Sequence, residues 1–161
     1  MTPSIRQSLI AVLSSPKFLF RMEIDDQPEN PEAHPINEFQ LATRLSYFLW
    51  SSCPDDELLR YALSNQLTPN LEAQIRRMMK DPRASEFVDN FAMQWLQLRR
   101  LSNHQADQKE FTRWRPGLKE SMLKETSLFF GEIVREDRSV LDLLDADFTY
   151  LDRRLGEIYK L

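Results

Sequence analysis

Residues 36–50 read INEFQLATRLSYFLW, and this stretch decides the fold class. Asn37 can cap a helix, because its side-chain oxygen can accept a hydrogen bond from the backbone N–H of Gln40, whose own side chain can return one. Ile36 can pack on Leu41 as a hydrophobic staple. Apolar residues then recur at helical spacing, which predicts one helix over the whole stretch. The face that it buries consists of Leu41, Leu45, Phe48 and Leu49.

Start signals of a similar kind recur along the chain. A proline at the first helical position costs no hydrogen bond, because the N–H groups of a first turn have no partner within the helix. Such a proline follows a side chain that can cap in Thr2-Pro3, Ser15-Pro16, Thr68-Pro69 and Asp81-Pro82. Pro54 also precedes three acidic residues, which the helix dipole favours in a first turn. These signals predict helices separated by short connections.

Two of the predicted helices are long. The first covers residues 81 to about 101, because its apolar residues recur at alternating spacings of three and four. The second covers residues 118 to about 137. After it, Thr149, with Asp152 three residues later, is expected to cap a final helix.

The sequence as a whole predicts an all-α protein, a compact bundle of about eight helices with no sheet. No stretch shows the sustained period-two alternation of a half-buried strand. Only three of the 161 residues are glycine, which argues against a fold with many tight hairpins. A chain of this length is enough for one ordinary domain with a sizeable core.

Residues 24–35 differ in composition from the rest. They contain three prolines and several acids but no Lys or Arg. Proline interrupts both helices and strands, and such a segment has little apolar surface to bury. We therefore predict an acidic, proline-rich linker here.

Charge and apolar content exclude several classes of protein. The net charge is −4, and basic residues are scattered among acidic ones, which argues against binding to nucleic acid. The longest apolar runs have four to five residues, far below the roughly 20 that a membrane-spanning helix needs. Nothing in the sequence sets the oligomeric state.

No metal or cofactor motif is complete. His34 and His104 both lie in predicted loops, and neither has a second ligand at zinc spacing. The chain has no Glu-x-x-His motif for a di-iron site, and a single cysteine, Cys53, cannot form the Cys-x-x-Cys-His motif of a c-type haem. Asp145 and Asp147 resemble the start of a calcium loop that lacks its glycine and its final glutamate. We expect no cofactor and no metal in this chain.

Three carboxylates remain as weak catalytic candidates: Glu125, Asp55 and Asp56. Glu125 falls beside the apolar stripe of its predicted helix, where a carboxylate needs a partner or a shifted pKa. Arg44 is one conceivable partner, and this pair would be a structural clasp. If Glu125 and one of the two aspartates faced a common cleft roughly 5–10 Å apart, they could act on a glycosidic bond. For each of them a structural role is the simpler interpretation.

One family resemblance rests on a series of motifs. Residues 44–59, RLSYFLWSSCPDDELL, follow the pattern RLSYFLWSSxPDDELL, and further motifs follow in the same order at residues 77–83, 91–96, 124–130, 137–144 and 147–151. Together they resemble a domain of unknown function found in large planctomycete proteins that also carry a cytochrome c-like domain. Residues 13–20, LSSPKFLF, resemble the end of the companion domain that precedes it.

The resemblance implies an organisation. Residues 1–23 would be the tail of a preceding helical module, and residues 36–161 the main helical domain, truncated at its C-terminal end. The parent protein would be extracytoplasmic, in the periplasm or at the cell surface. The partners would be its neighbouring domains, and any haem c would belong to a separate domain. The family brings no catalytic residues.

The leading interpretation is therefore a helical structural or interaction module of a large exported, cytochrome-associated protein. The sequence argues against an enzyme, because helix caps, prolines at helix starts and aromatic residues at helical spacing account for most of its distinctive residues. The alternative is a helical module of an extracytoplasmic enzyme, related to polysaccharide, that uses buried carboxylates.

Overall fold

The computed structural model describes residues 3–21, 23–25, 27–107 and 109–161, and every regular element in them is a helix. The all-α prediction is confirmed for this part of the chain. The elements include 3₁₀ segments (η1, η2 and η4) and one π-helical segment (η3). In chain order they are α1 (Pro3–Leu13), α2 (Pro16–Leu19), α3 (Glu38–Trp50), α4 (Asp56–Leu63), η1 (Thr68–Asn70), α5 (Leu71–Met79), η2 (Pro82–Ala84), α6 (Ser85–Phe87), η3 (Val88–Ala92), α7 (Met93–Trp95), η4 (Leu98–Asn103), α8 (Leu118–Arg135), α9 (Asp142–Asp145) and α10 (Arg153–Tyr159).

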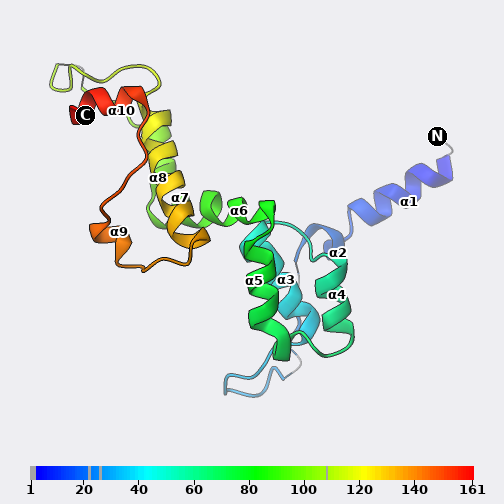
Figure 1. The fold of residues 1–161 in the computed structure, drawn as a ribbon. Coiled ribbons are helices and arrows are strands. Elements are labelled where there is room, and N and C mark those ends of the chain that lie inside the picture. The colour runs from blue at the N-terminus through cyan, green and yellow to red at the C-terminus, as the bar shows by residue number, and fades with distance from the viewer. Residues whose placement is uncertain (1–2, 22, 26, 108) are drawn as a thin grey trace.

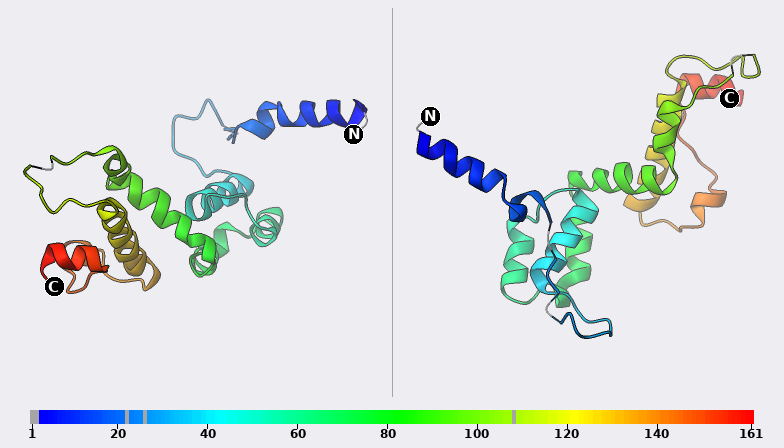
Figure 2. Two further views of the ribbon diagram at one scale, coloured as in Figure 1. Left: turned by 90° about the horizontal axis from the view of Figure 1, so that it is seen from above. Right: turned by 180° about the vertical axis from the view of Figure 1, so that it is seen from behind.

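The helices form two groups that are joined by α6 (Figure 1). In the first group, α3 packs against α4 and α5. In the second, α8 packs against α9 and α10 and also against η3 and η4, which follow α6. α1 projects from the first group, and its N-terminal end points away from both, as the two views in Figure 2 also show.

The first group has the larger core. The predicted capping box of α3 is present, with the Gln40 N–H donating to Asn37 Oδ1 at 2.9 Å and the Asn37 N–H donating to Gln40 Oε1 at 3.3 Å. At the other end of α3, the buried indole N–H of Trp50 donates to the carbonyl of Met78 at 3.0 Å and so fixes α3 against α5. The core consists of Ala42, Leu49, Trp50, Leu58, Ala62, Leu67 and Met78.

A smaller core lies where η3 crosses α8. It contains Val88, Ala92 and Phe130. Phe87 packs against both cores, and its ring stacks on that of Phe91 at 5.0 Å between centroids. Phe87 and Phe91 each contact both Phe48 of α3 and Phe130 of α8, so the two helix groups are coupled through aromatic side chains of the segment between them.

The prediction of one helix over residues 81–101 is wrong in its course and in its end. The start is right, because the Asp81 side chain accepts a hydrogen bond from the Arg83 N–H. The helix then passes through a 3₁₀ turn and a π-helical segment, and it ends at Trp95. The stop is Gln97, which takes a left-handed backbone conformation with φ 54°. A non-glycine residue rarely adopts this conformation, so its type gave no stop signal.

The predicted cap of the last helix is also wrong. Asp152, not Thr149, occupies the cap position of α10, and its side chain accepts a hydrogen bond from the Leu155 N–H at 3.0 Å. α8 ends at Arg135, two residues before the predicted end. Thr2, the first predicted cap, lies outside the described residues.

Within residues 24–35, the described positions form no helix. The segment nevertheless lies against α3, because the Gln40 side chain donates to the Ile24 carbonyl at 2.7 Å. His34 Nε2 lies 2.7 Å from Asp25 Oδ1, so the segment also has an internal polar contact.

The fold leaves much surface exposed. The accessible surface is 12,495 Å², whereas a globular monomer of 19.1 kDa exposes about 8,400 Å². α1 contributes to this excess with five apolar side chains that are 43–56% exposed: Ile5, Leu9, Ile10, Val12 and Leu13. None of the helices in the described ranges is both long and apolar enough to cross a membrane.

Candidate functional site

Asp55, the first catalytic candidate, is engaged in structural contacts on both carboxylate oxygens. It caps α4 by accepting the Leu58 N–H at 3.0 Å. Arg77 donates from Nη1 to Asp55 Oδ2 at 2.7 Å and from Nη2 to Oδ1 at 3.1 Å. The Nε of Arg77 also donates to the buried Gln74 side chain at 2.8 Å, so the pair belongs to a network between α4 and α5.

These contacts determine the ionisation of Asp55. Partial burial by itself raises the pKa of the carboxyl group, but the hydrogen bonds from Arg77 and Leu58, together with the charges of Arg77 and Arg83, outweigh it. The pKa of Asp55 is therefore below its usual value. A general acid needs a raised pKa, so this environment opposes that role.

Asp56, the second candidate, is exposed in the first turn of α4. An acid at this position interacts favourably with the helix dipole. Its neighbour Glu57 accepts a hydrogen bond from Gln74 at 3.2 Å and lies 3.5 Å from the Arg77 Nε. Of the two aspartates, only Asp55 is part of the network between α4 and α5.

Glu125, the third candidate, lies half-buried on α8 and accepts two hydrogen bonds from the C-terminal part of the chain. Thr149 donates to Oε1 at 2.9 Å and Tyr159 donates to Oε2 at 3.2 Å. Burial and the negative charge of Glu125 raise the pKa of Tyr159. Glu125 also lines a small pocket of about 350 Å³ together with Phe129 and Phe148.

The structure does not bring the predicted acids together. Asp55 belongs to the α3–α5 group, and Glu125 belongs to the α8–α10 group (Figure 1). The suggested clasp between Arg44 and Glu125 is wrong. Arg44 instead forms a two-point ion pair with Glu23, which joins α3 to the segment before it. The reason is that Arg44 and Glu125 lie in different helix groups, which helix periodicity cannot reveal.

The remaining polar candidates have local contacts. The ring of His104 meets the ring of Trp114 edge-on, with 6.0 Å between centroids. Cys53 is exposed, and its Sγ lies 3.5 Å from the Tyr47 hydroxyl. Among the described residues, Asp145 and Asp147 included, no group of three or more His, Cys, Asp or Glu side chains could hold a metal ion.

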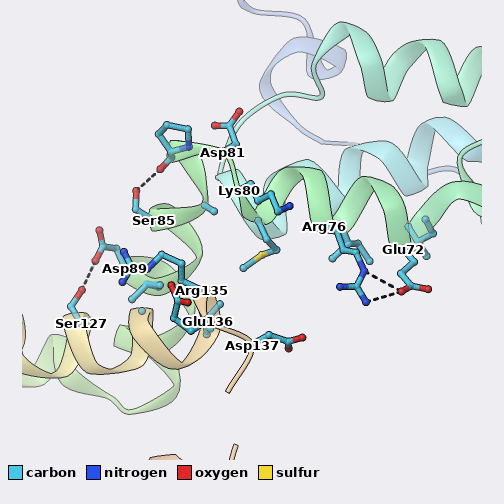
Figure 3. Close-up of a pocket in the computed structure, with 18 of the residues that line it drawn as sticks. Glu72, Arg76, Lys80, Asp81, Ser85, Asp89, Ser127, Arg135, Glu136 and Asp137 are labelled. Carbon is cyan, nitrogen blue, oxygen red and sulfur yellow. Dashed lines mark hydrogen bonds and ion pairs between the residues drawn. The ribbon is translucent and has the colours of Figure 1, made fainter. Parts of the chain in front are cut away.

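A groove of about 1300 Å³ lies between α5 and α8 and is roofed by η2, α6 and η3 (Figure 3). We call it the α5–α8 groove. Its apolar residues come from α5, η2, η3 and α8, so the groove depends on the segment from η2 to η3, which holds the two helix groups at an angle. They include Ile75, Met79, Ala84, Val88, Leu128 and Val134.

Charged side chains surround this apolar floor. Figure 3 shows Glu72 and Arg76 on α5 across from Arg135, Glu136 and Asp137 at the end of α8. Five acidic and three basic side chains line the groove in all, which gives a formal charge of −2. The acids are Glu72, Asp81, Asp89, Glu136 and Asp137, and the bases are Arg76, Lys80 and Arg135.

Two contacts that shape the site were not predicted. Ser127 on α8 donates to Asp89 on η3 at 3.1 Å and ties the α8 wall of the groove to its roof. Glu38, the first residue of α3, accepts the backbone N–H groups of Leu67 at 2.6 Å and Thr68 at 3.1 Å, which fixes the start of α5. An acid in a first turn signals a helix start, but nothing local indicates a partner 29 residues away.

These observations define the class of protein: a helical domain with a large apolar groove that has a charged rim. Its candidate acids do not share a cleft. Residues 36–161 match a protein family described as "Protein of unknown function (DUF1592)", labelled PSD4. The chain belongs to this family. No curated protein matches it, and no solved structure does.

Proposed function

We propose that this chain is a helical interaction module and that the α5–α8 groove receives an amphipathic helix from a neighbouring domain or a partner protein. The observation that carries the proposal is the groove itself. Recognition of a helix in a groove needs an apolar floor for side chains spaced three and four residues apart, and a polar rim that orients the helix. The α5–α8 groove has both.

The contacts of the candidate acids support this module over a carbohydrate-cleaving enzyme. Asp55 has a lowered pKa and is held by Arg77, whereas the general acid of a glycosidase needs a raised one. Glu125 accepts hydrogen bonds from Thr149 and Tyr159, in the other helix group. The carboxylates of Asp55 and Glu125 therefore each hold separate parts of the chain together, which is a structural role.

The family resemblance extends the proposal to the parent protein. In it, this module would connect neighbouring domains of a large exported protein, in the periplasm or at the cell surface. A cytochrome c-like domain of the same protein would carry haem c. The planctomycete origin and the cytochrome association rest on the sequence motifs at residues 44–59 and beyond.

The test compares amide hydrogen exchange in this chain and in its parent protein. If the groove is filled in the parent, exchange in α5 and in the Ser127–Arg135 part of α8 should be at least about tenfold slower there, because docking adds to local stability. Leu128→Glu, at a 39% exposed groove residue, should abolish this protection. Leu63→Glu, at an exposed leucine outside the groove, is the matched control and should leave it unchanged. Equal exchange in both proteins would refute the proposal.

A further inference from the structure

We infer that the groove accepts α1 of a second copy of this chain, so that two copies form a dimer by reciprocal exchange of α1. The inference rests on the proposed function, because it names one occupant of the same groove. It joins two features that are otherwise unrelated: an apolar helix that projects from the body, and an apolar groove of suitable size.

α1 has the pattern of a groove-binding helix. Ile5, Leu9 and Val12 are spaced at i, i+4 and i+7, and Leu13 completes the same face. All four are 43–56% exposed. A separate helix of 11 residues is only marginally stable in water, so α1 needs a surface that covers this face.

Charge favours the match. α1 itself carries one basic residue, Arg6, and no acidic residue. The residues that line the groove carry a formal charge of −2. Opposite potentials steer two surfaces together and set their relative orientation.

The position of α1 favours a second copy over the same chain. α3 lies between α1 and α5, and α1 points away from α5 and α8 in both figures that show the whole ribbon (Figures 1 and 2). To fill its own groove, α1 would have to leave its position beside α2. In a two-fold dimer, each copy can donate α1 and receive one, which closes the assembly.

The exposed area is sufficient. The chain exposes about 4,100 Å² more than a globular monomer of its mass. Two contacts of standard size, each about 1,600 Å² in total, would bury about 1,600 Å² per chain. A dimer formed in this way would bury less than half of the excess.

The first experiment is sedimentation of the full chain over a range of concentrations. We expect a concentration-dependent species of twice 19.1 kDa. Leu9→Glu on α1 and Leu128→Glu in the groove should each weaken the dimer at least about 100-fold, because each places a charge in an apolar contact. Gln7→Ala on the polar face of α1 and Leu63→Glu outside the groove should leave it unchanged. A monomer at all concentrations would overturn the inference.

A cross-linking experiment identifies the contact. In a Cys53→Ser background, a chain with Ser8→Cys on α1 is mixed with one that carries Ser85→Cys at the groove. We expect a disulfide between the two chains, and none when Ser64→Cys at the C-terminal end of α4 replaces Ser85→Cys. A disulfide that forms only within a single chain carrying both substitutions would show that α1 folds back, and would overturn the exchange.

A third measurement separates this inference from the proposed function. A labelled synthetic peptide of residues 3–21 is titrated into the full chain and into its Leu128→Glu variant. If the peptide binds only to the unsubstituted chain while that chain remains monomeric, the dimer is refuted but the groove still binds helices. If the peptide does not bind and exchange in the parent protein is unchanged, both proposals fail.

Discussion

Arg77 on α5 holds both carboxylate oxygens of Asp55 at the start of α4, with N–O distances of 2.7 and 3.1 Å. The same arginine lies with its guanidinium carbon 5.5 Å from the centre of the Trp50 ring, and Arg83 covers that ring at 3.5 Å. One ion pair thus connects α3, α4 and α5. It explains why residues from two of the sequence motifs, 44–59 and 77–83, meet in space.

Asp55→Ala should lower the free energy of unfolding by about 2–3 kcal/mol, since it removes both a helix cap and the partner of a partly buried arginine. Asp56→Ala, one residue away and exposed, should cost no more than about 1 kcal/mol. Urea denaturation of both variants measures the difference. Equal losses would show that the Arg77 pair contributes nothing measurable to stability.

Acid should destabilise the chain between about pH 4 and pH 2. Hydrogen bonds from the Arg83 side chain and N–H lower the pKa of Asp81 from 3.8 to about 2. Because the unfolded chain then binds the proton more tightly, the contribution of Asp81 is complete above pH 3.8 and is lost as the pH falls through 2. Urea midpoints measured across this range should fall less in Asp81→Asn than in the unsubstituted chain. Parallel curves would contradict the assignment.

Glu125→Gln should lower the pKa of Tyr159. Burial contributes most to its raised value, and the Glu125 charge contributes next, so removal of the charge alone should shift the pKa part of the way back. NMR titration of ¹³C-labelled tyrosine, assigned with Tyr159→Phe, measures the shift. A Tyr159 pKa that does not change in Glu125→Gln would contradict this account.

Two glycines should respond to alanine in opposite directions. Gly117 has φ +83°, and an added Cβ would lie 2.9 Å from Arg154 Cζ, the end of a flexible side chain. Gly117→Ala should therefore cost about 1–2 kcal/mol, mainly through backbone strain. Gly131 lies within α8, where a Cβ would be 3.7 Å from Val88, an ordinary contact distance, and Gly131→Ala should stabilise by about 0.5–1 kcal/mol. Thermal denaturation of both variants is the measurement, and the same sign in both would contradict this account.

Interactions between near neighbours in the chain could be predicted from the sequence. The capping box of Asn37 and Gln40 and the helix that starts after Pro54 depend on residues three or four positions apart. The stop at Gln97 could not be predicted, because a left-handed glutamine is stabilised by its surroundings and not by its own preference. The π-helical segment at Val88–Ala92 could not be predicted either, because the spacing of the apolar residues there fits a regular α-helix as well as a π-helix.

The sequence by itself determined that this protein is all helical and where most of its helices begin, because caps, prolines and apolar periodicity act within one or two turns. Tertiary structure alone decided that Arg44 pairs with Glu23, that Arg77 holds Asp55, and that α5 and α8 enclose a groove. The physical reason is that the angle between two helices is set by side chains far apart in the chain. Here Phe87 packs against both cores and Ser127 bonds to Asp89, and no local preference encodes either contact.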